Sequence, residues 1–365
     1  MDQPLKKILG EMATTLKEGM GIRAPDWVRD MAVFVATPER VIAAIDNELH
    51  LGSASEMLLS LLGPDGIAME EGDAAVSNDP YLGSPHLQDF YLLAPVHYKG
   101  KLVLYLGAKT HLPDIGGDIQ GGFNPRAEEI WAEGVRITPL KICRQGQSDT
   151  GILNMILLNS RTPDPTRKGL ESMMAAAEAG RKEALSCIRG SDGAESVLNE
   201  AEKIIQDTET RLREVVSLWP SGEYLGNCMV EDDSVKVKGL EIETKLLVKD
   251  SQIEIDLSTN RPQLKAPINS PRGNTLSFTL IPFLPLLHAG ISANGGIWTV
   301  ITVKTKKGTL VDPVLPAPTS FSPFHVGQEV SGAVRACMEK FLLKEERDRL
   351  ARRFSSLVNW HPKGL

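Results

Sequence analysis

The chain has 365 residues, of which 42% are hydrophobic and 24% charged, and its formal net charge is −7 at pH 7. This composition is typical of a globular protein with one large or two modest domains, and it argues against a general nucleic-acid binder and against a membrane-spanning protein, because no apolar run reaches about 18 residues. Four scattered cysteines without a C-x-x-C pair, and no signal-peptide pattern, predict reduced thiols and a cytoplasmic protein.

The first 76 residues are predicted to alternate between helices and short strands. Apolar residues at helical spacing predict a first helix, and a second helix follows the sequence His50-Leu51-Gly52. Continuous apolar runs bounded by turn residues predict buried strands. The expected elements are helices over 4–20 and 54–62 and strands over 31–36, 41–45 and 74–76.

The tetrad His-x-x-Asp occurs twice, as His86-Leu87-Gln88-Asp89 and as His111-Leu112-Pro113-Asp114. Between the tetrads lie two apolar runs, 90–96 and 102–106, which predict the two strands of a hairpin. Because a hairpin brings its own ends together, two imidazoles and up to two carboxylates would converge. That ligand set suits Zn, Mn or Fe.

The alternative is that the tetrads are ordinary turn residues, since His and Asp at i and i+3 occur easily by chance. The duplication at the far end of a predicted hairpin favours the metal site. Glycines flank both tetrads and allow the backbone to approach a ligand closely or to adopt positive φ. They are Gly83, Gly116, Gly117, Gly121 and Gly122.

Residues 125–134 are predicted to form a short helix after the glycine loop. We expect Glu128, Glu129 and Glu133 on a solvated face with Ile130 and Trp131 turned inward. An anion site at the start of this helix is the less favoured alternative.

The remainder predicts an α+β fold: a mixed α/β metal-site region over 1–165, a helical hairpin over 166–220 and a β-rich region over 221–365. Residues 274–287, which contain two prolines, are ambiguous between helix and strand. The other expected elements are strands over 136–143, 240–248, 252–257 and 300–303 and helices over 152–158, 168–190, 196–219 and 330–348.

These motifs resemble the hydantoinase B family. The similarity is carried by SNDPYLGSPHLQD, THLPDIGG, AEEIWAEGVRITPLKI, LNSRTP and KAPINS, in the order that the family has them, and it covers most of the chain. The family includes the B subunits of ATP-dependent hydantoinases, the C-terminal half of 5-oxoprolinases and the metal-carrying subunit of acetone and acetophenone carboxylases.

The resemblance implies a divalent metal held by His86, Asp89 and His111. Asp79 and Asp114 would orient these ligands, since a ligand histidine usually needs a hydrogen-bond acceptor for its other ring nitrogen. Such a metal polarises a carbonyl oxygen or activates water. Asp114 and His50 are candidate catalytic residues; His50 is equally well explained as a residue at a helix start. The sequence contains no Walker A loop, so ATP is expected on a hydantoinase A-like partner subunit that phosphorylates the small-molecule substrate.

Three functions remain open: a subunit that hydrolyses a cyclic amide, the equivalent subunit of a ketone carboxylase, or a truncated structural subunit. Family members continue into a glycine-rich C-terminal region, whereas this chain ends at Leu365. We therefore expect a short variant or a separate chain that supplies that region. The segment Gly21–Arg29 also departs from the family pattern.

Overall fold

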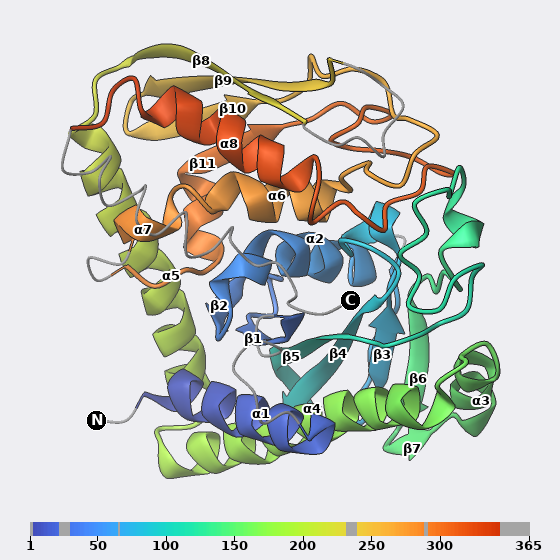
Figure 1. Ribbon diagram of the computed structural model, residues 1–365. Helices are drawn as coiled ribbons and strands as arrows, with labels where there is room; N and C mark the ends of the chain where they lie inside the picture. Colours follow the sequence, from blue (N-terminus) through green and yellow to red (C-terminus); the bar gives the residue numbers. More distant parts are fainter. Residues whose placement is uncertain (1–2, 22–29, 65, 231–238, 288–290, 344–365) are drawn as a thin grey trace.

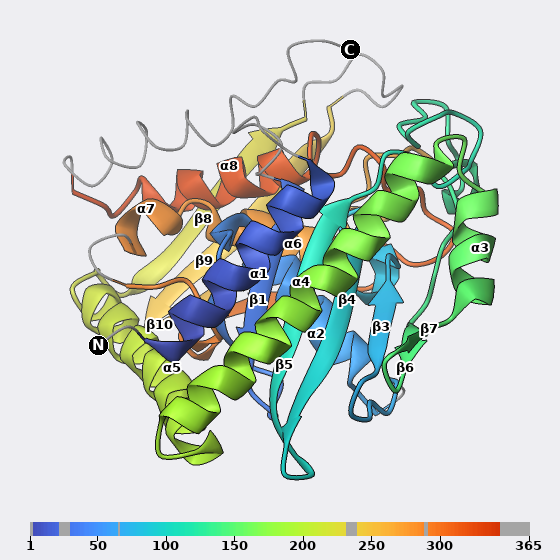
Figure 2. The same cartoon turned by 90° about the horizontal axis from the view of Figure 1, so that it is seen from below.

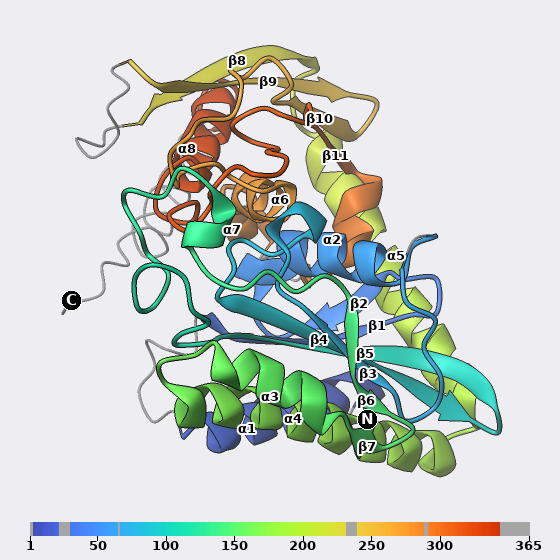
Figure 3. The same ribbon diagram turned by 90° about the vertical axis from the view of Figure 1, so that its right-hand side faces the viewer.

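The computed structural model describes residues 3–21, 30–64, 66–230, 239–287 and 291–343. These residues form four layers, which are helices, a large sheet, a second layer of helices and a smaller sheet (Figures 1 and 3). The predicted mixture of α and β structure is confirmed. Among the described helices, none combines the length and apolar character needed to cross a membrane.

The larger sheet contains seven strands in the order β2-β1-β5-β4-β3-β6-β7, and each neighbouring pair is antiparallel. Its centre is the predicted hairpin, β4 and β5. The strands are β1 (Ala32–Ala36), β2 (Ile42–Ile45), β3 (Ala74–Ser77), β4 (Asp89–Tyr98), β5 (Lys101–His111), β6 (Leu140–Arg144) and β7 (Gln147–Ser148).

Both faces of this sheet are buried, which explains why its strands are continuous apolar runs. Alternate side chains enter two separate cores. Phe90 and Leu92 face a lower core with the first helix layer, whereas Tyr91 and Leu93 face an upper core that continues to the smaller sheet.

The lower face is covered by α1 (Pro4–Met20) and α4 (Pro163–Gly190), which run side by side across the sheet (Figure 2). The predicted first helix is confirmed: Pro4 occupies its first turn and Gly21 ends it with φ 68°. Its buried stripe includes Leu5, Ile8 and Met12. The short helix α3 (Thr150–Leu158) packs beside α4.

Helix α5 (Ala194–Ser217) joins the layers along one side of the molecule (Figure 1). It follows α4 after a short turn at Ser191–Gly193, as the sequence predicts. Its first half contributes Val197 and Ala201 to the lower core, and its second half contributes Leu212 and Val216 to the upper core. The two cores therefore share one helix, and the three-part division of the chain stays a prediction.

The upper layers consist of helices packed under a four-stranded sheet of order β11-β10-β9-β8. In that sheet β10 and β11 are parallel and the other neighbours antiparallel. The helices are α2 (Leu51–Leu61), α6 (Arg272–Leu280), α7 (Leu284–Leu287) and α8 (Gly327–Met338), and the strands are β8 (Gly222–Met229), β9 (Glu241–Lys249), β10 (Gln252–Asp256) and β11 (Ile301–Lys304). Short 3-10 turns lie at Glu48–His50, Pro80–Leu82, Ile130–Ala132 and Gly295–Thr299.

Three local predictions need correction. Residues 125–134 form only the 3-10 turn Ile130–Ala132; Trp131 is 56% exposed, whereas Glu133 is fully buried.

The expected strand over 136–143 begins at Leu140, because Pro139 has no N–H to donate to a ladder. The last predicted helix covers Gly327–Met338, and residues 344–348 of that prediction lie outside the described part of the chain. In the ambiguous segment 274–287, α6 continues to Leu280 and α7 covers Leu284–Leu287, with a turn at residues 281–283 between them.

Candidate metal centre

The register of the central hairpin brings Asp89 and His111 together. They are the first cross-strand pair of β4 and β5, so their side chains leave the sheet on the same face. Lys109 precedes His111 by two residues and therefore lies on that face as well. The Oδ1 atom of Asp89 is 3.3 Å from Nδ1 of His111.

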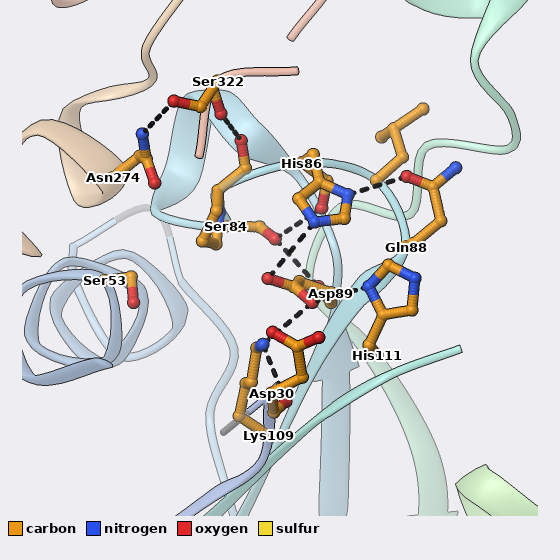
Figure 4. A network of polar contacts seen from close by, with 12 residues as sticks. Asp30, Ser53, Ser84, His86, Gln88, Asp89, Lys109, His111, Asn274 and Ser322 are labelled. Atoms are coloured by element: carbon orange, nitrogen blue, oxygen red, sulfur yellow. Dashed lines mark hydrogen bonds and ion pairs between the residues drawn. The ribbon is translucent and has the colours of Figure 1, made fainter. Parts of the chain in front are cut away.

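His86 reaches the same point from the turn that precedes β4. Ser84 Oγ lies 2.8 Å from the carbonyl oxygens of both His86 and Asp89 and closes this turn. The Nε2 atom of His86 is 3.6 Å from Oδ2 of Asp89, and the two imidazole centroids are 5.1 Å apart (Figure 4). One ligand atom from each of the three residues fits within a 4.8 Å cluster.

The donor geometry fits a divalent metal. Atoms bound at about 2.0–2.2 Å from one ion lie roughly 3–3.6 Å apart. The separations of 3.3 Å from His111 to Asp89 and of 3.6 Å from His86 to Asp89 lie in that range. Gln88 Oε1 lies 2.8 Å from His86 Nδ1 and can only accept, so Nδ1 carries the proton and the Nε2 lone pair faces Asp89. Burial lowers the pKa of His86, which keeps the imidazole neutral as ligation requires.

Asp89 shares its carboxylate with a buried lysine. Lys109 Nζ is 2.9 Å from Asp89 Oδ1 and donates a second bond of 2.8 Å to the carbonyl of Asp30 (Figure 4). Burial alone would raise the pKa of Asp89, but the Lys109 charge and the two histidines hold it well below its usual range. The carboxylate is therefore ionised and ready to bind a cation.

Aromatic rings form one wall of the site. Phe123 stacks on His111 with 6.0 Å between centroids and an interplanar angle of 13°, and its ring centroid is 5.5 Å from that of His86. Phe321 and Phe324 pack against Phe123 from the C-terminal part of the chain, at 5.6 and 5.7 Å. This half-buried apolar wall limits the access of water to the imidazoles.

The three predicted ligands converge, while the other predicted site residues have different neighbours. Asp79 caps the turn at Pro80 through Tyr81 N and pairs with Arg136 Nη1 at 2.8 Å. Asp114 is fully buried and accepts from the backbone N–H of Gly121 and from the backbone and guanidinium of Arg161.

His50 lies at the junction of the turn Glu48–His50 and α2, where its carbonyl accepts a bond from Ser53 Oγ. Its helix-start position is as predicted, but no side-chain cap bond to the helix is formed. It is not one of the three residues of the ligand cluster. A role of His50, Asp79 or Asp114 in the chemistry stays a prediction.

Sequence reasoning missed four side chains that shape the site: Gln88, Lys109, Phe123 and Glu133. Two of them carried a usable signal. Gln88 lies inside the first tetrad, and Lys109 is a charged residue in an apolar strand two positions before a predicted ligand. Phe123 and Glu133 act through contacts with residues about 200 positions away, which no local pattern reports.

Comparison with known proteins adds the family. A profile described as Hydantoinase B/oxoprolinase matches residues 6–357. The chain belongs to this family. The predicted resemblance is confirmed over nearly its whole length.

Relatives in the family include subunits of different enzymes. The chain is 30% identical over 313 residues to the caprolactamase subunit beta of Pseudomonas jessenii, covering 85% of this chain and 53% of that protein. It is 26% identical to the acetophenone carboxylase delta subunit of Aromatoleum aromaticum, covering 84% of this chain and 45% of that protein. The chain thus spans about half the length of these curated relatives.

A solved structure has the same fold. The crystal structure of the ATP-dependent caprolactamase from Pseudomonas jessenii matches with a TM-score of 0.83 and 27% identity, covering 92% of this chain and 58% of that chain. The match to the caprolactamase structure therefore includes both cores of this chain.

Proposed function

We propose that this chain is the metal-carrying B-type subunit of an ATP-dependent complex that opens a cyclic amide. In this proposal a hydantoinase A-like partner binds ATP and phosphorylates the carbonyl oxygen of the substrate. The B-type chain then completes hydrolysis. The convergence of His86, Asp89 and His111 on one point carries the proposal, and the caprolactamase relative supports the substrate class.

The residues of the chain prepare that point in three ways. Gln88 keeps the His86 lone pair available, and Lys109 keeps Asp89 ionised. Phe123 shields the imidazoles from water. A divalent metal held by the three ligands would supply a Lewis acid for a carbonyl or phosphoryl oxygen.

The alternative is the corresponding subunit of an ATP-dependent ketone carboxylase. The acetophenone carboxylase relative favours it. The same ligand set serves both reactions, because each needs a Lewis acid beside an activated oxygen. The substrate of the partner subunit, rather than the ligands, distinguishes them.

The first test measures metal content. We expect about one equivalent of Zn, Mn or Fe in the purified wild type by elemental mass spectrometry, and loss of it in His111→Ala. His97→Ala is the matched control, because His97 lies in the partner strand β4 near the opposite end of the hairpin, where it pairs with Leu102. Wild type that stays metal-free after reconstitution would refute the metal-carrying role and leave a structural subunit.

The second test measures turnover with an A-type partner. ATP-dependent opening of a lactam or hydantoin ring, lost in His111→Ala and kept in His97→Ala, is the expected result. ATP- and bicarbonate-dependent consumption of a ketone without ring opening would instead establish the carboxylase.

A further inference from the structure

Glu133 is a buried acid that the proposed chemistry does not use. Its carboxylate accepts three backbone contacts of 2.9–3.0 Å, two from Thr319 N–H and one from Ser320 N–H. Its own carbonyl oxygen accepts a bond of 3.0 Å from Gln88 Nε2. One residue therefore contacts two segments that are far apart in the sequence.

The first of these segments leads to a ligand. Gln88 is fully buried, and its amide spans the gap between Glu133 and His86, using one end for each. Gly122 packs directly on the amide nitrogen, where a Cβ atom would overlap it. The Gln88 side chain is thus held from two sides, and with it the proton on His86 Nδ1.

The second segment leads to the aromatic wall. Thr319 and Ser320 immediately precede Phe321, and Phe324 follows three residues later. The same loop contacts the N-terminal half again where Ile130 N–H donates to the carbonyl of Pro316 and where Ser322 Oγ donates to the carbonyl of Pro85. The carboxylate of Glu133 thereby fixes the backbone of the loop that carries Phe321 and Phe324.

Simple packing does not explain a carboxyl group at this position. Burial raises the pKa of Glu133 to about 7 in spite of the two N–H groups that donate to it, so the ionised side chain is costly. An apolar side chain would avoid that cost but would leave the Thr319 and Ser320 N–H groups unpaired. The carboxyl group is suited to holding the loop in one defined place.

We propose that Glu133 is a positioning residue that couples the metal ligand His86, through Gln88, to the loop 316–324 that carries Phe321 and Phe324. The inference rests on the proposed metal site. It adds that metal affinity depends on a carboxylate that touches neither the metal nor its ligands, and that metal binding in turn steadies the loop.

The test is a set of metal affinities, measured for Co²⁺ and Zn²⁺ by competition with a chelating dye on the full chain. We expect Glu133→Ala to weaken metal binding about tenfold. Loss of a residue that supports a metal ligand typically weakens metal affinity by about 10- to 100-fold, and the expected effect is at the lower end of that range. Glu133→Gln should recover most of the loss, because its amide oxygen can accept from both Thr319 and Ser320. Glu129→Ala, an exposed acid in the same segment, should bind like the wild type.

A double-mutant cycle shows whether the effect passes through Gln88. Gln88→Leu combined with Glu133→Ala should bind no more weakly than the weaker single variant. Fully additive losses, or wild-type affinity in a folded Glu133→Ala protein, would overturn the proposal. Wild type without any metal affinity would instead refute the proposed function itself.

Hydrogen exchange in the wild type provides a readout that needs no variant. Metal should slow exchange of the Thr319 and Ser320 amides by about the same factor as Glu133→Ala weakens binding, because coupling between two sites is reciprocal. Should Glu133→Ala fail to fold, this measurement decides: unchanged exchange at both amides on metal binding would reject the coupling.

Discussion

Lys109 and Asp89 form an ion pair inside the protein, with Nζ 2.9 Å from Oδ1 and both side chains nearly inaccessible to solvent. Their positions follow from the hairpin. Lys109 and His111 are two residues apart in β5 and so lie on the same face of the sheet, and His111 pairs with Asp89 across the strands. The Lys109–Asp89 pair itself carries no net charge. A bound divalent cation would therefore compete with the ammonium group for the same carboxylate.

Lys109→Met should destabilise the metal-free protein by about 3–5 kcal/mol, because it leaves the buried Asp89 carboxylate without a counter-charge. A saturating divalent metal would supply that charge. We therefore expect the metal-dependent rise in melting temperature to be larger in Lys109→Met than in the wild type. Lys101→Met, at the exposed start of the same strand, is the control. Equal metal-dependent shifts in the two variants would contradict the charge argument.

Glu133 should make stability depend on pH. Its pKa is raised by burial from 4.5 to about 7 in the folded chain, so its favourable contribution is complete below pH 4.5 and is lost as the pH rises through 7. The loss is on the order of 3 kcal/mol. Urea unfolding at pH 5 and pH 8 should show a smaller difference for Glu133→Gln than for the wild type. Glu129→Gln should keep the wild-type difference; the same slope in all three proteins would rule out this titration.

Two glycine-to-alanine substitutions in helices should have opposite effects. A Cβ atom at Gly52 in α2 would overlap the backbone of Leu276 and Ser277 in α6, whereas a Cβ atom at Gly10 in α1 meets nothing within 4 Å. We expect Gly52→Ala to lower the free energy of unfolding by about 1–3 kcal/mol or more. Gly10→Ala should raise it by about 0.5–1 kcal/mol, as helix propensity predicts. A loss in both would show that the close approach of α2 and α6 is not the cause.

Asp114→Ala distinguishes two roles for Asp114: orienting the candidate metal ligands, or holding the backbone around Gly121 and Arg161 in place. The contacts of its carboxylate with Gly121 and Arg161 predict a loss of stability of about 2–3 kcal/mol, since both partners are left without a buried acceptor. Metal content should stay that of the wild type. Measured metal loss in a folded Asp114→Ala protein would instead support the orienting role inferred from the family resemblance.

The convergence of the three candidate ligands was predictable because it is local. His86, Asp89 and His111 lie within one hairpin, and the period of two in a strand together with a short turn determines which of their side chains meet. The register found for β4 and β5 is the one in which Asp89 and His111 are partners. Element types were predictable for the same reason.

The residues that surround the candidate ligands could not be predicted from local sequence. Glu133 was expected on a solvated face because acidic residues in a short polar segment usually are. Its burial depends on two N–H groups of a loop 186 and 187 residues further along the chain. Trp131, two residues earlier, is 56% exposed, so both side chains have the opposite exposure to the predicted one. Only the tertiary arrangement contains that information.

The spacing of these contacts along the chain implies an order of assembly during synthesis. The pair Asp89 and His111 is separated by 22 residues, whereas Glu133 waits for Thr319, which the ribosome adds 186 residues later. Short-range contacts close first, and domains form from the N-terminal side as the chain emerges. The three candidate ligands would thus meet on a nascent chain before Phe321 and Phe324 have been synthesised. An ion captured at that stage would be enclosed only when translation reaches the loop.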